Sequence, residues 1–186
     1  MKKRMDQTGH KRAILLLLAV GVAAAVGAFL FFGQRHPEGP SETGAPEATT
    51  LARLYFADPL EACLRAEERR IAHEAGQTAK AEALVEALIQ GPTRDLARTL
   101  SPNAAVKDVV VRKGVAYVDL TAAAVSEHLG GSESELLTVY SIVNTICLNM
   151  PELKAAKILI EGESAATFKG HMDLRFALKP DRTLIR

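Results

Sequence analysis

The longest apolar stretch of the chain lies near its start, where residues 13–32 contain no charged or strongly polar side chain. A helix that rises about 1.5 Å per residue would extend roughly 30 Å over this stretch, which matches the hydrocarbon core of a bilayer. A cleaved signal peptide is the alternative, but its apolar region is usually about 7–15 residues long and is followed by small residues. Here the small residues 23–25 precede more apolar sequence that ends at Phe32. We therefore predict a retained transmembrane helix at residues 13–32.

The next segment, residues 33–51, is rich in proline, glycine and small polar residues and has almost no bulky apolar side chain. Such a composition cannot bury a core, so we predict a flexible linker. A flexible chain of this length has an average end-to-end distance of roughly 23 Å. The linker would therefore keep a folded domain, predicted over residues 52–186, close to the membrane and free to reorient.

Alternating or valine-rich stretches predict the first strand and a hairpin. Residues 51–57 read as a strand that ends at Asp58 and the proline after it. Residues 107–112 and 115–120 are rich in β-branched and aromatic side chains. They flank Lys113-Gly114, a two-residue loop that suits the twist of a hairpin.

Three further stretches complete the predicted strands. Residues 156–160 read as a strand, and residues 166–185 look like one or two shorter strands. Residues 63–75 are ambiguous, because alanine, glutamate and arginine favour a helix there, whereas the alternation from Glu67 to Ile71 fits a strand.

The first amphipathic helix is predicted over residues 79–90, where apolar side chains recur at i, i+3, i+4 and i+7. Thr78 can cap its start, and Gly91 followed by proline ends it, since glycine adopts the left-handed conformation and proline cannot continue a helix.

The second helix is predicted over residues 133–149, with Ser132 and Glu135 as a capping box and Pro151 just beyond its end. Two amphipathic helices and several half-buried strands predict an α/β (α+β) domain. The expected architecture is a two-layer sandwich, with both main helices packed on one face of a mixed sheet.

Basic residues gather at the start of the chain. Five of residues 1–12 are lysine or arginine, and Arg35 is the only basic residue in the twenty that follow the apolar stretch. The positive-inside rule then makes residues 1–12 a cytoplasmic tail and places residues 33–186 across the membrane. We expect a single-pass protein of the inner (cytoplasmic) membrane whose C-terminal domain lies outside the cytoplasm.

The predicted domain itself has no excess of charge. The whole chain carries 23 Lys and Arg against 22 Asp and Glu, and six and four of these precede residue 52, which leaves 17 basic and 18 acidic residues. We therefore predict no nucleic-acid partner.

The two cysteines, Cys63 and Cys147, would both lie outside the cytoplasm, where a disulfide can form. The alternative is that both are buried thiols that act as small apolar groups. No cysteine follows the apolar stretch closely, so we do not expect a lipid-modified N-terminus.

The histidines do not form a metal-binding or catalytic pattern. His73, His128 and His171 lie about 50 residues apart, and none has the spacing of a metal-ligand pair. His171 and Asp173 would share one strand face, where a structural or surface pair explains them better than a catalytic dyad. With no nucleophile elbow and no phosphate-binding glycine loop, we predict no catalytic residue, no cofactor and no metal site.

Four other polar residues are candidates for structural roles. Asp119 could cap the turn that follows it or accept backbone N–H bonds. Asn144 is unfavourable in mid-helix, so we expect it to bind a neighbouring loop or strand. Glu67 and Arg69 should form an ion pair on one strand face. The absence of tryptophan and an aromatic content of 5% argue against a sugar-stacking platform.

Seven short phrases span nearly all of residues 52–180. They are residues 54–56 (LYF), 67–71 (EERRI), 83–92 (ALVEALIQGP), 114–120 (GVAYVDL), 139–145 (VYSIVNT), 158–162 (ILIEG) and 170–174 (GHMDL). In this order and spacing they resemble the GerMN domain of the sporulation and spore-germination protein GerM family.

This resemblance implies an α/β fold akin to the ring-building-motif modules of spore-envelope secretion complexes, and no enzyme activity. It implies a place outside the membrane, behind an N-terminal anchor or a lipid attachment. It also favours a strand over residues 68–73. Some relatives carry two copies of the domain in tandem, whereas this chain carries one.

The leading hypothesis is therefore a membrane-anchored, extracytoplasmic and non-catalytic protein-interaction module of the bacterial cell envelope, which binds another envelope protein or itself. The alternative is a peptidoglycan-related envelope enzyme or accessory protein, which needs a cleft where His171, Asp173 or Asp119 converge with perturbed pKa values. A small-ligand sensor would instead need a closed apolar pocket between helices and sheet. No sequence feature directly supports peptidoglycan binding.

Overall fold

The computed structural model of the chain describes residues 48–186. The predicted cytoplasmic tail (1–12), the predicted transmembrane helix (13–32) and nearly all of the predicted linker (33–51) lie outside these residues. Among the helices from residue 48 onward, none combines the length and the apolar character that crossing a bilayer requires.

The strands form two sheets. β1 (Thr49–Ala57) and β2 (Leu64–Ala72) make an antiparallel two-stranded ribbon, with β1 starting slightly earlier than predicted. β3 (Val106–Arg112), β4 (Val115–Leu120) and β5 (Ala155–Ile160) make a three-stranded mixed sheet, in which β4 is antiparallel to β3 and parallel to β5. The strand favoured within residues 63–75 is thus confirmed as β2.

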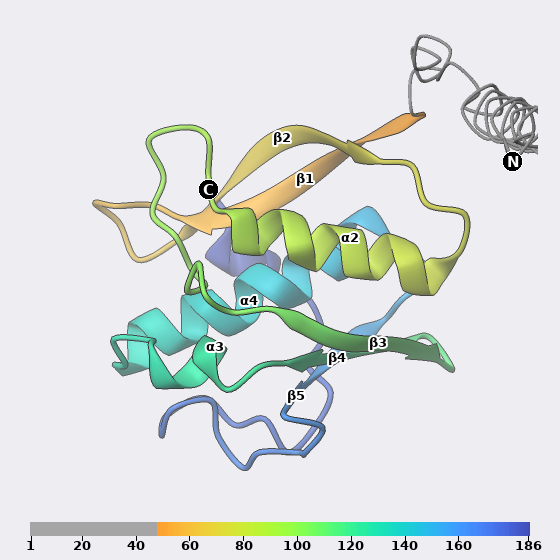
Figure 1. The fold of residues 1–186 in the computed structure, drawn as a ribbon. Helices are drawn as coiled ribbons and strands as arrows, with labels where there is room; N and C mark the ends of the chain where they lie inside the picture. Colours follow the sequence, from red (N-terminus) through yellow and green to blue (C-terminus); the bar gives the residue numbers. More distant parts are fainter. Residues whose placement is uncertain (1–47) are drawn as a thin grey trace, which may run out of the picture. The chain divides into compact units, whose positions relative to one another are not determined.

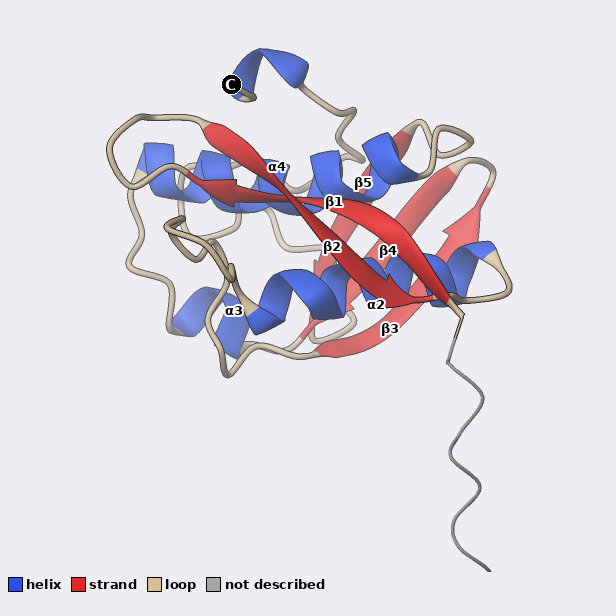
Figure 2. Cartoon of the chain, turned by 90° about the horizontal axis from the view of Figure 1, so that it is seen from above, coloured by secondary structure: helices blue, strands red, loops and turns tan. Residues whose placement is uncertain are grey.

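The two main helices lie between these sheets (Figure 1). α2 (Gln77–Gln90) contacts β1 and β2 on one side and β3 and β4 on the other, and α4 (Ser132–Asn149) contacts β1, β5 and α2. Seen from above, the β1–β2 ribbon lies across both helices (Figure 2). The predicted α/β class, with two main helices on a mixed sheet, is confirmed, and the ribbon adds a second sheet on the other side of the helices.

One continuous apolar core joins the helices to both sheets. Its formation follows from the periodicity of the sequence, since the apolar positions of each helix and strand point into the same layer. The largest fully buried apolar side chains include Leu54 and Phe56 of β1, Leu84 and Leu88 of α2, Ile142 and Ile146 of α4, Leu120 of β4 and Ile158 of β5.

The sequence correctly predicted the hairpin turn and the end of α2, but not how α2 and α4 begin. Lys113 (φ 51°) and Gly114 (φ 75°) both have positive φ, the signature of the tight hairpin turn between β3 and β4. Gly91 ends α2 with φ 85°, as predicted. The predicted side-chain caps were wrong, because the chain enters α2 at Gly76 and α4 at Gly131, each with positive φ and no side-chain cap bond.

Two other features of the fold depart from the sequence prediction. A short helix, α3 (Ala123–Ser126), was not predicted. The expected strands within residues 166–185 are wrong, because this segment makes only isolated bridges and one 3-10 turn, η1 (Arg182–Leu184). The reason is that side chains of the core, rather than a neighbouring strand, bind much of its backbone.

Candidate functional site

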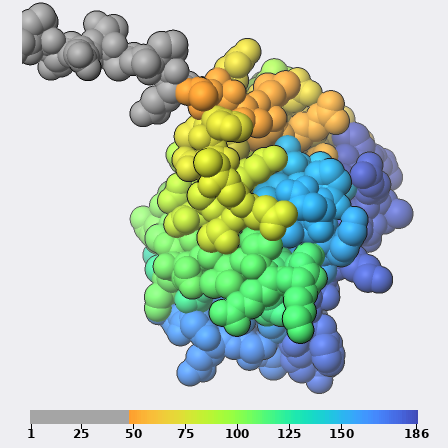
Figure 3. All heavy atoms as spheres, turned by 90° about the vertical axis from the view of Figure 1, so that its right-hand side faces the viewer, coloured from red at the N-terminus to blue at the C-terminus, as the bar shows by residue number. Residues whose placement is uncertain are grey.

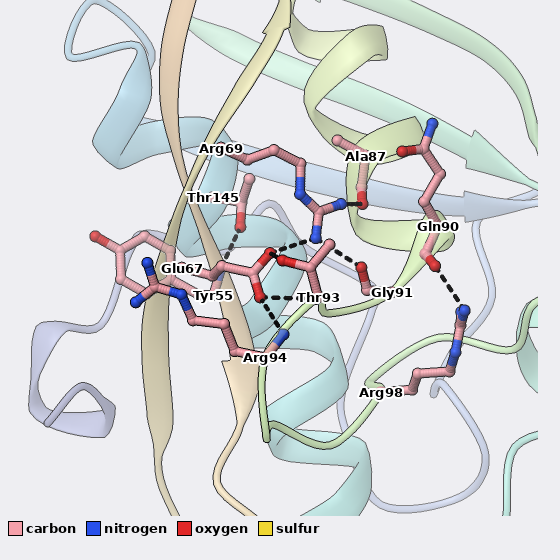
Figure 4. A network of polar contacts seen from close by, with 10 residues as sticks. All are labelled: Tyr55, Glu67, Arg69, Ala87, Gln90, Gly91, Thr93, Arg94, Arg98 and Thr145. Atoms are coloured by element: carbon pink, nitrogen blue, oxygen red, sulfur yellow. Dashed lines mark hydrogen bonds and ion pairs between the residues drawn. The ribbon is translucent and has the colours of Figure 1, made fainter.

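Glu67 and Arg69 form the predicted ion pair on β2, and the pair is inside the protein (Figure 4). The Glu67 side chain is 1% exposed and accepts hydrogen bonds from the Thr93 N–H (2.8 Å), the Thr93 hydroxyl (2.9 Å), the Arg94 N–H (3.1 Å) and the Arg69 guanidinium. Burial alone would raise the pKa of Glu67, but these hydrogen bonds outweigh it and lower the pKa.

Two arginines also bind the carboxyl end of α2. Arg69 donates to the carbonyls of Ala87 (3.1 Å) and Gly91 (2.8 Å), and Arg98 donates to those of Ile89 (2.8 Å) and Gln90 (2.5 Å). Cations at this end satisfy free carbonyls and complement the helix dipole. The Glu67–Arg69 pair therefore fastens β2 to the end of α2 and to the loop after it, which is a structural task.

Glu135, which was predicted only as part of a helix cap, is the centre of a second buried network. Its carboxylate accepts hydrogen bonds from the backbone N–H groups of Lys169 (3.1 Å), His171 (2.9 Å) and Met172 (3.1 Å) and contacts the His171 ring through Nδ1 (2.8 Å). Burial would raise the pKa of Glu135, but these bonds lower it to about 2.

Two more buried side chains hold the same part of the chain, residues 163–181, which we call the C-terminal strap. Lys157 of β5 donates to the Ser164 hydroxyl (2.6 Å) and to the Leu174 carbonyl. Asn144 of α4 accepts from the Asp181 N–H (2.9 Å) and donates to the Asp181 carbonyl (2.8 Å), which confirms its predicted role. Burial lowers the pKa of Lys157.

The histidine and aspartate candidates are not brought together. His171 binds Glu135 instead of Asp173, and Asp173 pairs with Arg175 (2.8 Å), which lowers the pKa of that carboxyl to about 2. The predicted shared strand face is wrong because the strap is not a strand. Asp119 is buried and accepts from the Gly162 N–H (2.8 Å), which confirms that it accepts a backbone N–H.

The other two histidines have partners of their own. His128 contacts the Thr138 hydroxyl through Nε2 (2.9 Å) and accepts the Gly130 N–H at Nδ1 (2.9 Å), while His73 contacts the Thr50 hydroxyl (2.7 Å). Over residues 48–186, no group of three His, Cys, Asp or Glu side chains is arranged to hold a metal ion.

The cysteines are two free, buried thiols, so the disulfide alternative is not realised in this structure. Burial raises the pKa of Cys63, helped by the nearby carboxylates of Asp58 and Glu61. Burial also raises the pKa of Cys147 to about 11. Thiols of this kind are poor nucleophiles at neutral pH.

The outer edge of β1 is covered by polar side chains of α4 that the sequence reasoning missed. Asn149 accepts from the Arg53 N–H (2.9 Å) and donates to its carbonyl (2.7 Å). The Tyr55 N–H donates to the Thr145 hydroxyl (3.1 Å) (Figure 4). Ser141 donates to the Tyr55 carbonyl (2.6 Å). The sequence signal for these contacts was a polar residue at every fourth position of α4, at 141, 145 and 149.

Two strand edges stay open in the part of the chain that the structure describes. β5 has a short backbone pairing with Leu178, and β1 ends in a pairing with Ala97. The outer edge of β3, and that of β2 beyond Leu64, have no strand or side chain bound to their backbone there. Open edges offer unpaired backbone groups to another chain.

A shallow hollow of about 320 Å³ lies on the three-stranded sheet, lined by Val110 and Arg112 of β3, Tyr117 of β4 and Leu159 of β5. These positions alternate with residues of the apolar core, which are Val109 on β3, Ala116 and Val118 on β4, and Ile158 on β5. The hollow is therefore on the face turned away from the helices. It is therefore not the closed pocket between helices and sheet that a small-ligand sensor would need.

Comparison with known proteins points to one family. The family model named Germane, described as sporulation and spore germination, matches residues 53–166. No curated protein matches the chain.

Solved structures share the fold at low identity. The first GerMN domain of GerM from Bacillus subtilis is 18% identical, with a TM-score of 0.54 over 73% of this chain and 99% of that one. The tandem GerMN domains of the same protein are 18% identical with a TM-score of 0.54, and the match covers 71% of this chain but 46% of that one. A putative lipoprotein from Clostridium perfringens is 21% identical, with a TM-score of 0.51 over 71% and 88%.

Proposed function

This chain belongs to the Germane family of sporulation and spore germination domains, and from that premise we propose that it is a non-catalytic protein-interaction module of the bacterial cell envelope. The resemblance to GerMN domains inferred from the seven sequence phrases is confirmed by the family match and by the shared fold.

The observation that carries the proposal is that the polar residues suited to catalysis are engaged in holding backbone or a surface partner. Glu135 binds three backbone N–H groups and His171, Asp119 binds that of Gly162, and Asp173 pairs with Arg175. An enzyme of the peptidoglycan-related kind would need such groups to converge on one cleft. The features left over are open strand edges, which suit protein binding.

We further propose that residues 13–32 anchor the protein in the cytoplasmic membrane, with residues 1–12 in the cytoplasm and the domain outside. The support is the flanking charge asymmetry and the unbroken apolar stretch. One protein of similar fold is described as a putative lipoprotein, and this supports a location of the domain at a membrane surface. A tether raises the local concentration of the domain, so weak contacts become effective.

Topology is tested with the full-length protein carrying a tag at each end. Protease added to spheroplasts should digest residues 52–186, while the N-terminal tag stays membrane-bound and protected. A soluble domain with a new N-terminus near residues 25–28 would show a cleaved signal peptide instead.

The non-catalytic role is tested by replacing His171 and Asp173 together with alanine in the full-length chain. Because the two side chains do not contact each other, we expect the double variant to rescue the cellular phenotype of a deletion strain as well as the wild-type protein does. Thermal unfolding of the variant gives the control for folding. A fully folded double variant that fails to rescue would support the enzyme alternative.

A further inference from the structure

We propose that the outer edge of β3 and the hollow beside it form one docking site, which takes an extended segment of a partner protein bearing an aliphatic and an acidic side chain. This inference rests on the proposed interaction role and names its surface and the chemistry of its partner. Three observations carry it: an open edge, a hollow that shares residues with that edge, and two polar groups in the hollow without partners.

The edge and the hollow are continuous. Val110 and Arg112 line the hollow and belong to β3, the strand whose outer side has no backbone partner in residues 48–186. On β3 their neighbour across the sheet is β4, where Tyr117 stands directly opposite Val110. A strand added to β3 would therefore place alternate side chains on the face that carries the hollow.

The chemistry of the hollow fits one apolar side chain and one carboxylate. Val110 and Leu159 supply an apolar surface, while Arg112 and Tyr117 supply a guanidinium and a hydroxyl. Neither of these two polar side chains makes a hydrogen bond or an ion pair within the described chain. An arginine can bind a carboxylate with two parallel hydrogen bonds, which adds direction as well as attraction.

Three neighbouring charges on this sheet have partners of their own or are buried, and the exposed Asp108 of β3 lies outside the lining of the hollow. Lys107 pairs with Glu161 (2.5 Å), Asp119 binds the Gly162 N–H, and Lys157 is buried under the strap. Among the four residues that line the hollow, Arg112 is the one that carries a charge, and it favours an acidic side chain at that place in the bound segment.

The other open edge lacks these features. On β2 the exposed Glu68 pairs with Arg53 of β1 (3.2 Å), and Arg70 bonds to the Thr49 hydroxyl (3.3 Å). Arg70 is therefore the matched control for Arg112: an exposed arginine on an open edge strand, without an adjoining hollow.

The hairpin that carries the site stands at the surface of the molecule. Figure 3 looks onto its tip, coloured green, below the yellow connection from β2 to α2. The end of β3 that carries Arg112 therefore lies at the surface, where Arg112 and Lys113 are both exposed.

The first test uses the full-length protein in lipid nanodiscs and two fluorescent peptides of alternating valine and threonine, identical except that one carries glutamate and the other lysine at a central position. We expect the glutamate peptide to bind several-fold more tightly, as for one favourable ion pair against one repulsive pair. Arg112→Glu should reverse this preference, and Arg70→Glu should leave it unchanged. Equal binding of both peptides, or a preference that Arg112→Glu does not alter, would overturn the proposal.

The second test separates this site from the interaction role as a whole. Photoreactive residues are placed in the full-length chain in cells at Asp108, on the same face of β3 as Val110, and at Glu68 on β2. The proposal predicts crosslinks from position 108 to an acidic segment of a partner, and their loss in Arg112→Glu but not in Arg70→Glu. Crosslinks from position 68 alone would overturn this site and leave the interaction role standing. Crosslinks from neither position would remove support from both.

Discussion

The buried polar side chains of this domain bind backbone groups far away in the sequence. Glu135, Lys157 and Asn144 each reach the C-terminal strap, and a buried polar group is tolerated only when its hydrogen bonds are satisfied. The hydrogen bonds of these three side chains hold an irregular segment in place, instead of the backbone hydrogen bonds that a strand would have made. Loss of one anchor leaves both a buried side chain and backbone N–H or C=O groups without partners.

Replacement of Glu135 by glutamine should destabilise the domain in a pH-dependent way. The pKa of Glu135 is lowered from 4.5 to about 2 in the folded protein, so its carboxylate stabilises the fold above pH 4.5 and that contribution is lost as the pH falls towards 2. We expect a loss of about 2–3 kcal/mol in the free energy of unfolding at pH 7, because a buried charge-assisted network is broken.

The measurement is urea unfolding of wild type and variant at pH 7 and pH 3, with Glu133→Gln as the control. Glu133 is an exposed carboxylate in the same turn of α4, so its replacement should change the stability by no more than about 0.5 kcal/mol. The difference between Glu135→Gln and wild type should shrink at pH 3. A difference that is constant with pH would show that the ionised carboxylate is not the anchor.

The two thiols should be unreactive in the native protein. With its pKa at about 11, Cys147 is a thiolate in roughly one molecule in a thousand at pH 8, and burial also shields it from reagents. We expect Ellman's reagent to label Cys63 and Cys147 only after denaturation, and reductant to leave thermal unfolding unchanged. A disulfide-linked peptide in a non-reducing digest of exported protein would contradict this.

The sequence predicted the role of a single residue correctly where the signal was local. Asn144 stood out because asparagine disfavours a helix interior, and its partner is indeed the backbone of a distant loop. Glu135 was misread because Ser-x-x-Glu is also a capping pattern, and nothing near it in the sequence points to residues 169–172. The same holds for Lys157, whose partners come from the strap.

At the scale of elements, side chains of α4 bind the outer edge of β1, where the backbone of a neighbouring strand would otherwise bind. Ser141, Thr145 and Asn149 are one helical turn apart and meet the alternate backbone groups of Arg53 and Tyr55. The row satisfies the edge of β1 and fixes the helix along the ribbon at the same time. It also closes the outer edge of β1, so the open edge of this ribbon is that of β2.

Replacement of Asn149 by alanine should therefore cost more than an ordinary helix substitution. The Arg53 N–H and carbonyl lose their partner, and since both bonds are exposed to solvent we expect a loss of about 0.5–1.5 kcal/mol in the free energy of unfolding. Ser132→Ala is the control, because Ser132 makes no capping bond in α4 and its replacement should stay within about 0.5 kcal/mol. Both are measured by chemical denaturation. A cost of about 1 kcal/mol for Ser132→Ala would restore the predicted capping box.

Elements built from neighbouring residues were predictable, and those built from distant contacts were not. The β3–β4 hairpin and the end of α2 depend on Lys113, Gly114 and Gly91, whose conformational preferences are intrinsic. The strap has no such signal, since its course is set by side chains of α4 and β5. Whether strands form one sheet or two depends on packing between helices, which periodicity alone does not reveal.

At the scale of the whole molecule, the proposed function combines weak docking with a tether. The open edge of β3 offers few backbone groups, and one exposed ion pair at Arg112 contributes only about 0–1 kcal/mol. Such a site binds weakly in solution, whereas attachment to the same membrane as the partner makes the encounter effectively intramolecular. The near balance of 17 basic and 18 acidic residues in the domain, among 23 and 22 in the chain, implies that this contact depends only mildly on salt.

Release of the domain from the membrane should therefore strongly reduce partner capture without changing the fold. We would compare the full-length chain with residues 48–186 exported behind a cleavable signal peptide to the same level outside the membrane. Crosslinks from position 108 should fall by about tenfold or more in the released form, because effective concentrations in the millimolar range are lost. Thermal unfolding of the released domain gives the control for folding, and a second comparison at high ionic strength should change capture only slightly. Equal capture by the anchored and released forms would show that affinity, rather than confinement at the membrane, brings the partner to the domain.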